Sequence, residues 1–209
     1  MDWAILWEYR EAILMGFTVT LWVSAAGIVG STIVGVTVGC LGTLPSPFVL
    51  RLVGVYTEGL RNVPVLVKLF FLYFVIGLPA ITAIILALIL HQSAPIADVT
   101  RAGIRSIARG QLDASMSLGH SRWQAFRYVI LPQAVRIVIP PMTEQYVSVI
   151  KSSSVAALIS VNDLTFETRE INAETFRGFE AATAATLLYI LIAMVVIFLM
   201  SRLQRRFER

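Results

Sequence analysis

Long uncharged apolar runs alternate with short polar segments along the 209 residues of this chain. The first run, residues 16–40, holds no charged residue and exceeds the roughly 20 helical residues that cross a bilayer. The same pattern predicts about five transmembrane helices, which we place at about 16–40, 48–76, 80–99, 133–160 and 181–200. The hydrophobic pattern therefore predicts an all-α integral membrane protein, with residues 1–209 forming a single transmembrane domain.

Small residues recur every four positions in the first span, at Ser31, Gly35 and Gly39. This spacing places them on one helix face, where the backbone of another helix can approach closely. The second span is unusual because it carries charged residues and is interrupted by Pro64. In the fourth span we expect Pro140 and Pro141 to break the helix early.

The composition agrees with a membrane protein: 57% of the residues are hydrophobic and 14% charged, against roughly 25% charged in soluble domains. The formal net charge of +4 does not indicate nucleic acid as a partner, because most of the arginines flank apolar runs. The lone cysteine, Cys40, cannot form an internal disulfide. It does not make a metal cluster with His91 and His120 either, so we expect no metal site.

The basic residues are distributed unequally between the two sides of the five-span arrangement. Three arginines fall on the side of the N-terminus, and eleven fall on the other side: Arg51, Arg101, Arg105, Arg109, Arg122, Arg127, Arg136, Arg202, Arg205, Arg206 and Arg209. Cytoplasmic loops carry the excess of Lys and Arg in membrane proteins. We therefore expect a multi-pass protein whose N-terminus lies outside and whose C-terminus is cytoplasmic.

A basic, polar segment between apolar runs, residues 101–132, has a helical pattern of its own. We predict one short helix at residues 111–118, ended by Gly119, which suits a helix C-terminus. Ser121 can cap a second helix, which we expect Pro132 to stop. Two helices joined by a glycine turn form a compact knob, on which a soluble partner could dock. A solvated linker is the alternative interpretation.

The knob carries a motif known from one family of membrane proteins. The chain reads Asp113-Ala114-Ser115, then Gly119, then Val129-Ile130-Leu131-Pro132, at the spacing of the signature E-A-A-x3-G-x9-I-x-L-P. It differs from that signature in three residues, Asp for Glu, Ser for Ala and Val for Ile. The chain thus resembles the permease subunits of bacterial ABC importers for polar amino acids, of the histidine, glutamine and glutamate type. The segments LRNVPVLVKLFFLYF, RAGIRSIARGQ, VILPQAVRIVIPP and IKSSSVAALISVNDL resemble that branch as well.

The resemblance implies a function and a set of partners. The knob would be a cytoplasmic coupling helix that contacts an ATPase through Gly110, Gln111, Asp113, Ala114, Ser115, Gly119 and Arg122. Expected partners are ABC ATPase subunits, a second permease chain (identical or related), a periplasmic substrate-binding protein and the lipid bilayer. The resemblance also implies the bacterial inner membrane as the location, with the N-terminus periplasmic and the C-terminus cytoplasmic. The chain has no G-x-x-x-x-G-K-[ST] phosphate loop, so ATP and Mg²⁺ would be bound and ATP hydrolysed on the partner subunit. We expect no enzyme activity and no cofactor in this chain.

Polar residues at membrane depth are functional candidates, since each charge there costs about 2.5–3.5 kcal/mol on insertion scales. The candidate substrate-pathway residues are Glu58, Arg61, Asn62, Lys68, Glu144 and Lys151. Glu58 and Arg61 are three residues apart and could neutralise each other. Pro64 removes a backbone hydrogen bond, so the carbonyl near residue 60 must find a neighbour, a water molecule or a ligand.

Three further sets of residues leave alternatives open. Lys68 and Glu144 could form a salt bridge between the second and fourth spans, or could bind the carboxylate and the ammonium of a zwitterion. The hydroxyls of residues 152–154, beside Lys151, could line a wet path or bond back to helix carbonyls. The acidic segment beyond them is a solvated loop or short helix, and Glu167, Glu170 and Glu174 could meet a binding protein.

The sequence therefore predicts the permease subunit of an ATP-driven ABC importer that moves polar amino acids or close analogues into the cytoplasm. One alternative is an ABC permease for another solute, such as an opine or a compatible solute. Two others are a secondary transporter or channel that works without ATP, and a membrane scaffold that conducts nothing. The scaffold leaves the charges at membrane depth unexplained.

Overall fold

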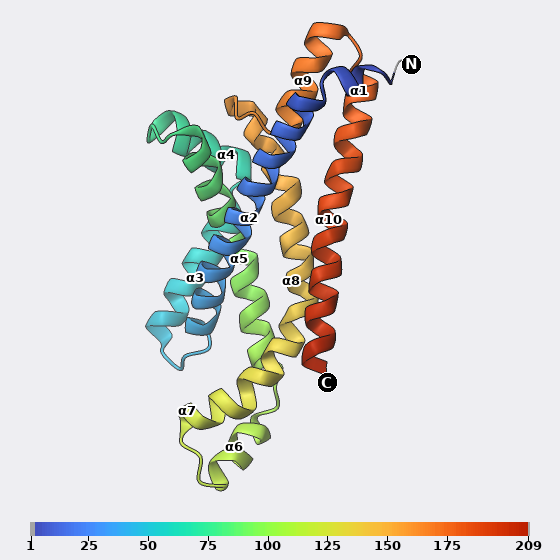
Figure 1. Cartoon of the computed structure of the whole chain (residues 1–209). Coiled ribbons are helices and arrows are strands. Elements are labelled where there is room, and N and C mark those ends of the chain that lie inside the picture. Colours follow the sequence, from blue (N-terminus) through green and yellow to red (C-terminus); the bar gives the residue numbers. More distant parts are fainter. Residues whose placement is uncertain (1–2, 209) are drawn as a thin grey trace.

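The computed structural model describes residues 3–208, and all the regular structure in that range is helical. The chain runs from the N-terminal end of the molecule to the opposite end and back, with a pair of short helices projecting beyond the ends of the long ones (Figure 1). The elements are α1 (Ile5–Glu8), α2 (Arg10–Leu41), α3 (Pro47–Arg61), α4 (Val65–Phe70), η1 (Phe71–Val75), α5 (Ala80–Arg105), α6 (Arg109–Ser117), α7 (Arg122–Ala125), η2 (Phe126–Ile130), α8 (Leu131–Ser153), η3 (Ser154–Ile159), α9 (Leu164–Thr175) and α10 (Gly178–Glu208). The predicted all-α class is confirmed for these residues.

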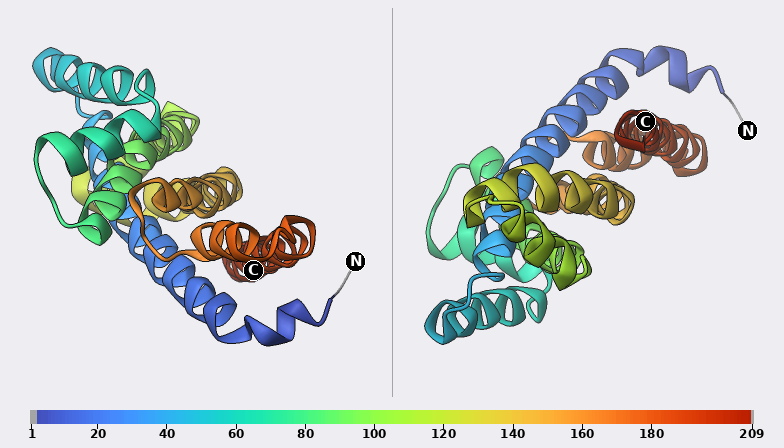
Figure 2. Two further views of the ribbon diagram at one scale, coloured as in Figure 1. Left: turned by 90° about the horizontal axis from the view of Figure 1, so that it is seen from above. Right: turned by 90° about the horizontal axis from the view of Figure 1, so that it is seen from below.

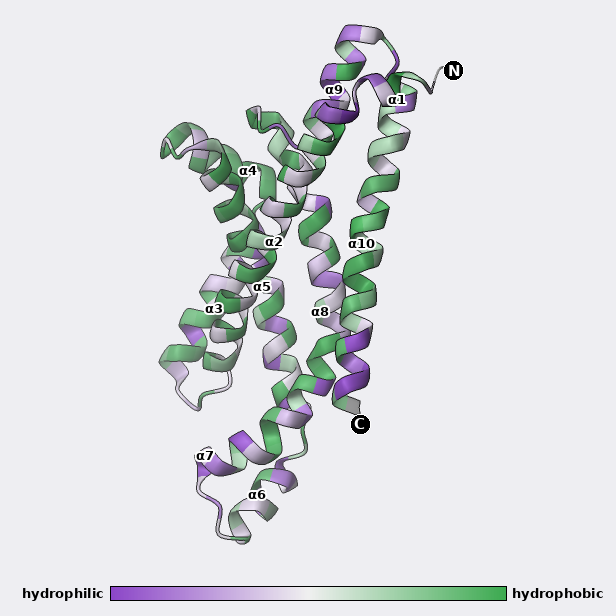
Figure 3. Cartoon of the chain, viewed as in Figure 1, coloured by the Kyte–Doolittle hydropathy of each residue, from purple (hydrophilic) through white to green (hydrophobic). Residues whose placement is uncertain are grey.

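Within residues 3–208, three helices are long and apolar enough to cross a membrane: α2, α5 and α10. They correspond to the first, third and fifth predicted spans, and the apolar surface of α10 extends along most of its length (Figure 3). A fourth span results if the helical stretch from Arg122 to Ile159 is joined with α9, to which it is bent by 48°. The second predicted span is not a single helix, because residues 62–64 divide it into α3 and the α4–η1 unit.

Helices α2 and α5 pack closely against each other at the small residues of α2. Ser31, Gly35 and Gly39 are all buried. A Cβ atom added to Gly35 would lie 2.5 Å from Cγ2 of Ile96, which leaves no room for a side chain. The prediction that this face admits another backbone is confirmed, and α5 is the helix that packs there.

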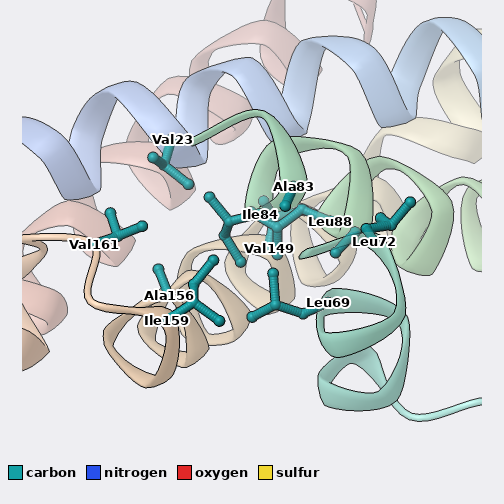
Figure 4. Packing of buried hydrophobic residues seen from close by; sticks show 11 residues of the cluster. Val23, Leu69, Leu72, Ala83, Ile84, Leu88, Val149, Ala156, Ile159 and Val161 are labelled. Atoms are coloured by element: carbon teal, nitrogen blue, oxygen red, sulfur yellow. The ribbon is translucent and has the colours of Figure 1, made fainter. Parts of the chain in front are cut away.

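The apolar core lies where α2, α4, α5, α8 and η3 meet. Leu69, Ile84, Leu88 and Val149 are at most 1% exposed, and their side chains converge in the close-up view (Figure 4). Viewed along the long helices, α3 lies at one edge of the molecule and α10 at the other, with the core elements between them (Figure 2). This core holds the α4–η1 unit against α5 and α8, and so fixes the position of the helix break at residues 62–64.

Two predictions about proline are wrong. The helix does not stop at Pro132, because the π-helical η2 passes directly into α8 and places Pro132 in the first turn of α8. Proline is tolerated in the first turn of a helix, where its missing N–H is not needed. Nor do Pro140 and Pro141 break the fourth span, since both lie inside α8. Helix α8 runs through both prolines, although their nitrogens cannot donate backbone hydrogen bonds.

Candidate functional site

The helix break between α3 and α4 is closed by a lysine from the same chain. Pro64 has no N–H, so the carbonyl of Leu60 has no helical donor. The Lys68 ammonium donates to this carbonyl oxygen at 2.6 Å and to that of Val63 at 3.0 Å, and it lies 3.2 Å from Nδ1 of His91. Lys68 is only 7% exposed. A neighbour, a water molecule or a ligand was expected to bond the freed carbonyl. In the structure a neighbouring side chain, Lys68, does so.

The alternative of a salt bridge between Lys68 and Glu144 is not realised. Lys68 and Glu144 form no ion pair with each other in the described part of the chain. Glu144 is exposed on α8. An ammonium group has three donors, and the three partners of Lys68 account for all of them. In this arrangement Lys68 therefore has no donor left for Glu144 or for a carboxylate ligand.

The expected neutralisation of Arg61 by Glu58 is also absent. Arg61 instead pairs with Asp98 of α5, at 2.7 Å, and the other oxygen of Asp98 accepts from Arg101 at 2.9 Å. Glu58 and Asn62 are exposed near the end of α3. Spacing on one helix suggested the Glu58 pair, but the α3–α5 contact brings a better-placed acid to Arg61. Asp98 therefore joins the set of polar residues around the break.

Glu144 and Lys151 lie on α8, both exposed, and seven residues apart. Seven residues are close to two helical turns, about 10.5 Å along the axis, so the two charges share one helix face. In the described part of the chain neither side chain has a hydrogen bond or an ion pair. The neighbouring hydroxyls do bond back to the helix, because Ser153 donates to the Ile150 carbonyl and Ser154 to the Lys151 carbonyl, both at 2.8 Å.

The segment before α9 contains a buried acid that the sequence reasoning missed. Asp163 is 1% exposed and caps α9, where its Oδ1 accepts a hydrogen bond from the Phe166 N–H at 2.8 Å. The adjacent Leu164 N–H donates to Thr20 of α2, and the Tyr189 hydroxyl of α10 lies 3.4 Å from Asp163 Oδ2. An aspartate immediately before an amphipathic stretch was the available signal. Asp163 thus ties the start of α9 to two long helices.

The acidic segment itself forms a helix, so the short-helix alternative holds. Glu167 is buried, whereas Glu170 and Glu174 of α9 are exposed. Glu174 accepts a hydrogen bond from the Tyr9 hydroxyl at 2.8 Å. This bond, with the negative charge of Glu174, raises the pKa of the Tyr9 phenol above its ordinary value. The N-terminal segment is therefore attached to α9 by an exposed contact.

The knob has the predicted two-helix form. Gly119 follows α6 with a φ of +90°, a left-handed conformation that favours glycine, and it ends that helix. Ser121 and Gln124 form a reciprocal capping box at α7: Ser121 Oγ accepts from the Gln124 N–H at 3.3 Å, and Gln124 Oε1 accepts from the Ser121 N–H at 2.8 Å. Ser115 is buried and hydrogen-bonded to Nδ1 of His120 at 2.9 Å, which ties α6 to the turn.

The remaining motif residues of the knob point outward. Six of the seven predicted coupling residues are exposed, and these are Gly110, Gln111, Asp113, Ala114, Gly119 and Arg122. The knob lies at the far end of the molecule from α1, beyond the end of α10 (Figure 1). Exposed side chains on a rigid turn outside the spans can be contacted by a second protein without disturbing the helix packing.

Comparison with known proteins shows the family to which this chain belongs. Residues 12–209 match the family described as "Binding-protein-dependent transport system inner membrane component". The chain is 33% identical to the glutamine transport system permease protein GlnP of Escherichia coli (strain K12), with 99% of this chain and 98% of that protein covered. It is 31% identical to the glutamate/aspartate import permease protein GltJ of the same strain, over 95% of this chain and 88% of that protein.

A solved structure agrees over the whole length. The crystal structure described as an amino acid ABC transporter with histidines superposes with a TM-score of 0.88 at 27% identity, and the match covers 99% of both chains. The likeness extends over nearly the whole of both chains, so the overall arrangement of the helices is shared.

Proposed function

The chain belongs to the family of binding-protein-dependent transport system inner membrane components, and from this membership we propose that it imports polar amino acids as the permease subunit of an ABC transporter. The relatives named above are a glutamine permease and a glutamate/aspartate permease, and both are similar over nearly the whole of this chain. The substrate class rests on these two names together with the charged residues at membrane depth. The alternative function is an ABC permease for another solute, such as an opine or a compatible solute.

The observation that carries the proposal is the knob. Its motif spacing folds into α6, the Gly119 turn and α7, and it presents exposed residues beyond the ends of the spans. A soluble ATPase that contacts this surface would bind ATP and Mg²⁺ and hydrolyse ATP, because this chain carries no phosphate loop. Closure of the ATPase dimer would move the knob, and α8 would carry that movement into the membrane through its continuous connection with α7 and η2.

The proposed assembly contains two permease chains, two ATPase subunits and a substrate-binding protein. The excess of arginine at the knob end favours a cytoplasmic location for the knob and the C-terminus, which leaves the N-terminus and α9 on the periplasmic side. The exposed carboxylates Glu170 and Glu174 would then face the binding protein. The exposed charges of α8 favour a second permease chain, because Glu144 and Lys151 need a wet path or a protein partner at membrane depth.

Two exposed glycines provide a matched test, one in the knob and one in α3. No neighbouring atom lies within 4 Å of a Cβ added to Gly119 or to Gly59, but only Gly119 has a positive φ. We expect Gly119→Ala to distort the turn, to reduce ATPase co-purification and to abolish uptake of a radiolabelled amino acid in cells. Gly59→Ala, outside the knob, should leave both nearly unchanged. Normal uptake with the ATPase absent or inactivated would contradict the proposal and favour an ATP-independent transporter.

A further inference from the structure

A cavity of about 390 Å³ lies between α8, α9 and α10, away from the helix break. Its polar lining consists of one cation and four hydroxyls, and its remaining lining is aliphatic. The polar residues are Lys151, Ser154, Thr165, Thr186 and Tyr189. None of the lining residues is acidic, so nothing in the cavity itself neutralises the lysine.

The cavity lies at membrane depth. Its α10 lining runs from Thr186 to Ala193, between 9 and 16 residues before Arg202 at the charged end of that helix. At 1.5 Å per residue this separation is about 14 to 24 Å, well inside the ~30 Å hydrocarbon thickness of a bilayer. An unpaired lysine at this depth is costly unless water or an anionic group reaches it.

Two of the four hydroxyls have their protons committed to backbone carbonyls. Ser154 donates to the Lys151 carbonyl at 2.8 Å, and Thr186 donates to the Ala182 carbonyl at 2.8 Å. The hydroxyl oxygens of these two residues therefore remain as acceptors towards the cavity. The Lys151 ammonium, in contrast, offers only donors. The cavity thus combines donors for a carboxylate with acceptors for an ammonium group, beside an aliphatic surface formed by Ile150, Ile190 and Ala193.

We propose that this cavity is a substrate subsite, in which Lys151 binds the α-carboxylate and the oxygens of Ser154 and Thr186 accept hydrogen bonds from the α-ammonium of a transported amino acid. The subsite recognises the zwitterionic head group shared by all α-amino acids, and it leaves the choice of side chain to other residues. Lys68 was one candidate for binding the carboxylate, but it has no donor left. Lys151 is therefore the lysine that binds it. The inference deepens the proposed function and rests on it.

The test measures binding of radiolabelled L-glutamine to the permease–ATPase complex purified without the binding protein, so that the Kd belongs to the permease. Lys151→Met removes the charge at similar length, and we expect it to weaken binding by about tenfold or more, the usual loss for a charge-assisted hydrogen bond. Thr186→Val should weaken binding by about two- to fivefold. Thr183→Val is the matched control: Thr183 also donates to a carbonyl four residues earlier, at 2.7 Å, but does not line the cavity.

Competing ligands identify what the cavity recognises. In the wild-type complex, 4-aminobutanamide, which is glutamine without its carboxylate, should compete at least about tenfold less well than glutamine, and Lys151→Met should abolish this difference. Unchanged glutamine binding in Lys151→Met, while wild-type cells import amino acids, would overturn the subsite and leave the proposed function standing. Lysine-dependent binding of oleate but not of glutamine would assign the cavity to a lipid carboxylate and overturn the subsite as well. Absence of amino acid uptake in wild-type cells would instead overturn the proposed function.

Discussion

The helix break around Lys68 and the α8 face around Lys151 each place a lysine at membrane depth, but the two regions treat it in opposite ways. Lys68 is buried, and all three of its donors have partners within the chain. Lys151 is exposed towards a cavity and has no partner in the described residues. A charge that is fully satisfied inside one chain stabilises that chain. A charge that has no partner inside the chain can bind a ligand that enters and leaves the cavity.

The difference follows from the backbone beside each lysine. Pro64 frees the Leu60 carbonyl at the end of α3, where the helix dipole is negative and attracts a cation. Lys151 lies near the end of α8, but the serines that follow bond back to the carbonyls of Ile150 and Lys151. The nearby carbonyls are thus partly occupied, and the lysine ammonium has no backbone cage to enter. The two regions should therefore respond differently to the same substitution.

The largest effect on stability is expected for Lys68→Met. This change leaves the carbonyl oxygens of Leu60 and Val63 without their donor, and each unsatisfied buried acceptor costs about 1–3 kcal/mol. Part of this loss is offset because the buried charge is removed, so we expect a net destabilisation of about 2–4 kcal/mol. Thermal unfolding of the detergent-purified protein measures the effect.

Lys151→Met is the matched control for this prediction. An exposed lysine without a partner should change stability by less than about 0.5 kcal/mol when it is replaced. Equal losses of stability in the two variants would show that the lysines are equivalent and would remove the contrast between the two regions.

The next largest effect on stability is expected where α2 packs against α5. Gly35→Ala would place a Cβ 2.5 Å from Ile96 and force the two helices apart, at a cost of about 1–3 kcal/mol. Gly54→Ala is the control, because no atom lies within 4 Å of a Cβ on Gly54 of α3. The control should be neutral or slightly stabilising, since alanine is the better helix former. The same unfolding assay decides between the two results, and equal losses would mean that the contact between α2 and α5 is not tightly packed.

The sequence was sufficient to predict the elements that depend on local chemistry. The close-packed face of α2, the Gly119 turn and the Ser121 cap follow from residue type and spacing, and the structure contains all three. The bonding partners could not be predicted in the same way. Arg61 bonds Asp98 and Lys68 bonds a carbonyl, because the packing of α3 and α4 against α5 decides which groups meet.

The prolines of the fourth span were misjudged for a related reason. Proline signals a helix end when only local bonds are counted, but η2 accommodates Pro132 with a π-helical turn, and α8 continues through Pro140 and Pro141. Burial of Met142, Val149 and Ile150 favours a continuous α8 strongly enough to outweigh the lost backbone bonds. Tertiary packing of this kind leaves no signal in the spacing of residues along one helix.

Glu144→Gln should separate transport from stability on the open face. The exposed carboxylate has no partner in the described chain, so its loss should leave the unfolding temperature nearly unchanged. Uptake should fall by about tenfold if the carboxylate attracts the ammonium group of a passing solute, a difference of about 1.4 kcal/mol. Uptake of a radiolabelled amino acid in cells, with expression verified, measures this. Full uptake in the variant would assign Glu144 to a contact outside the pathway.

The smallest effect is expected at the contact between Tyr9 and Glu174, which belongs to neither region. Its hydrogen bond is exposed, so Tyr9→Phe should shift the unfolding midpoint by about 1 °C or less. Because Glu174 raises the pKa of the folded Tyr9 phenol, the contact contributes below the unfolded pKa of about 10 and is lost as the pH rises through the folded value. The small difference between wild type and Tyr9→Phe should therefore be constant from pH 7 to 9 and should disappear at more alkaline pH. A difference that grew with pH would mean that the pKa of the phenol is lowered in the folded state, and would contradict the hydrogen bond to Glu174. A large loss of stability at neutral pH would mean that the contact between the N-terminal segment and α9 helps to hold α2 in place. The buried lysine and the packing of α2 against α5 would then not be sufficient.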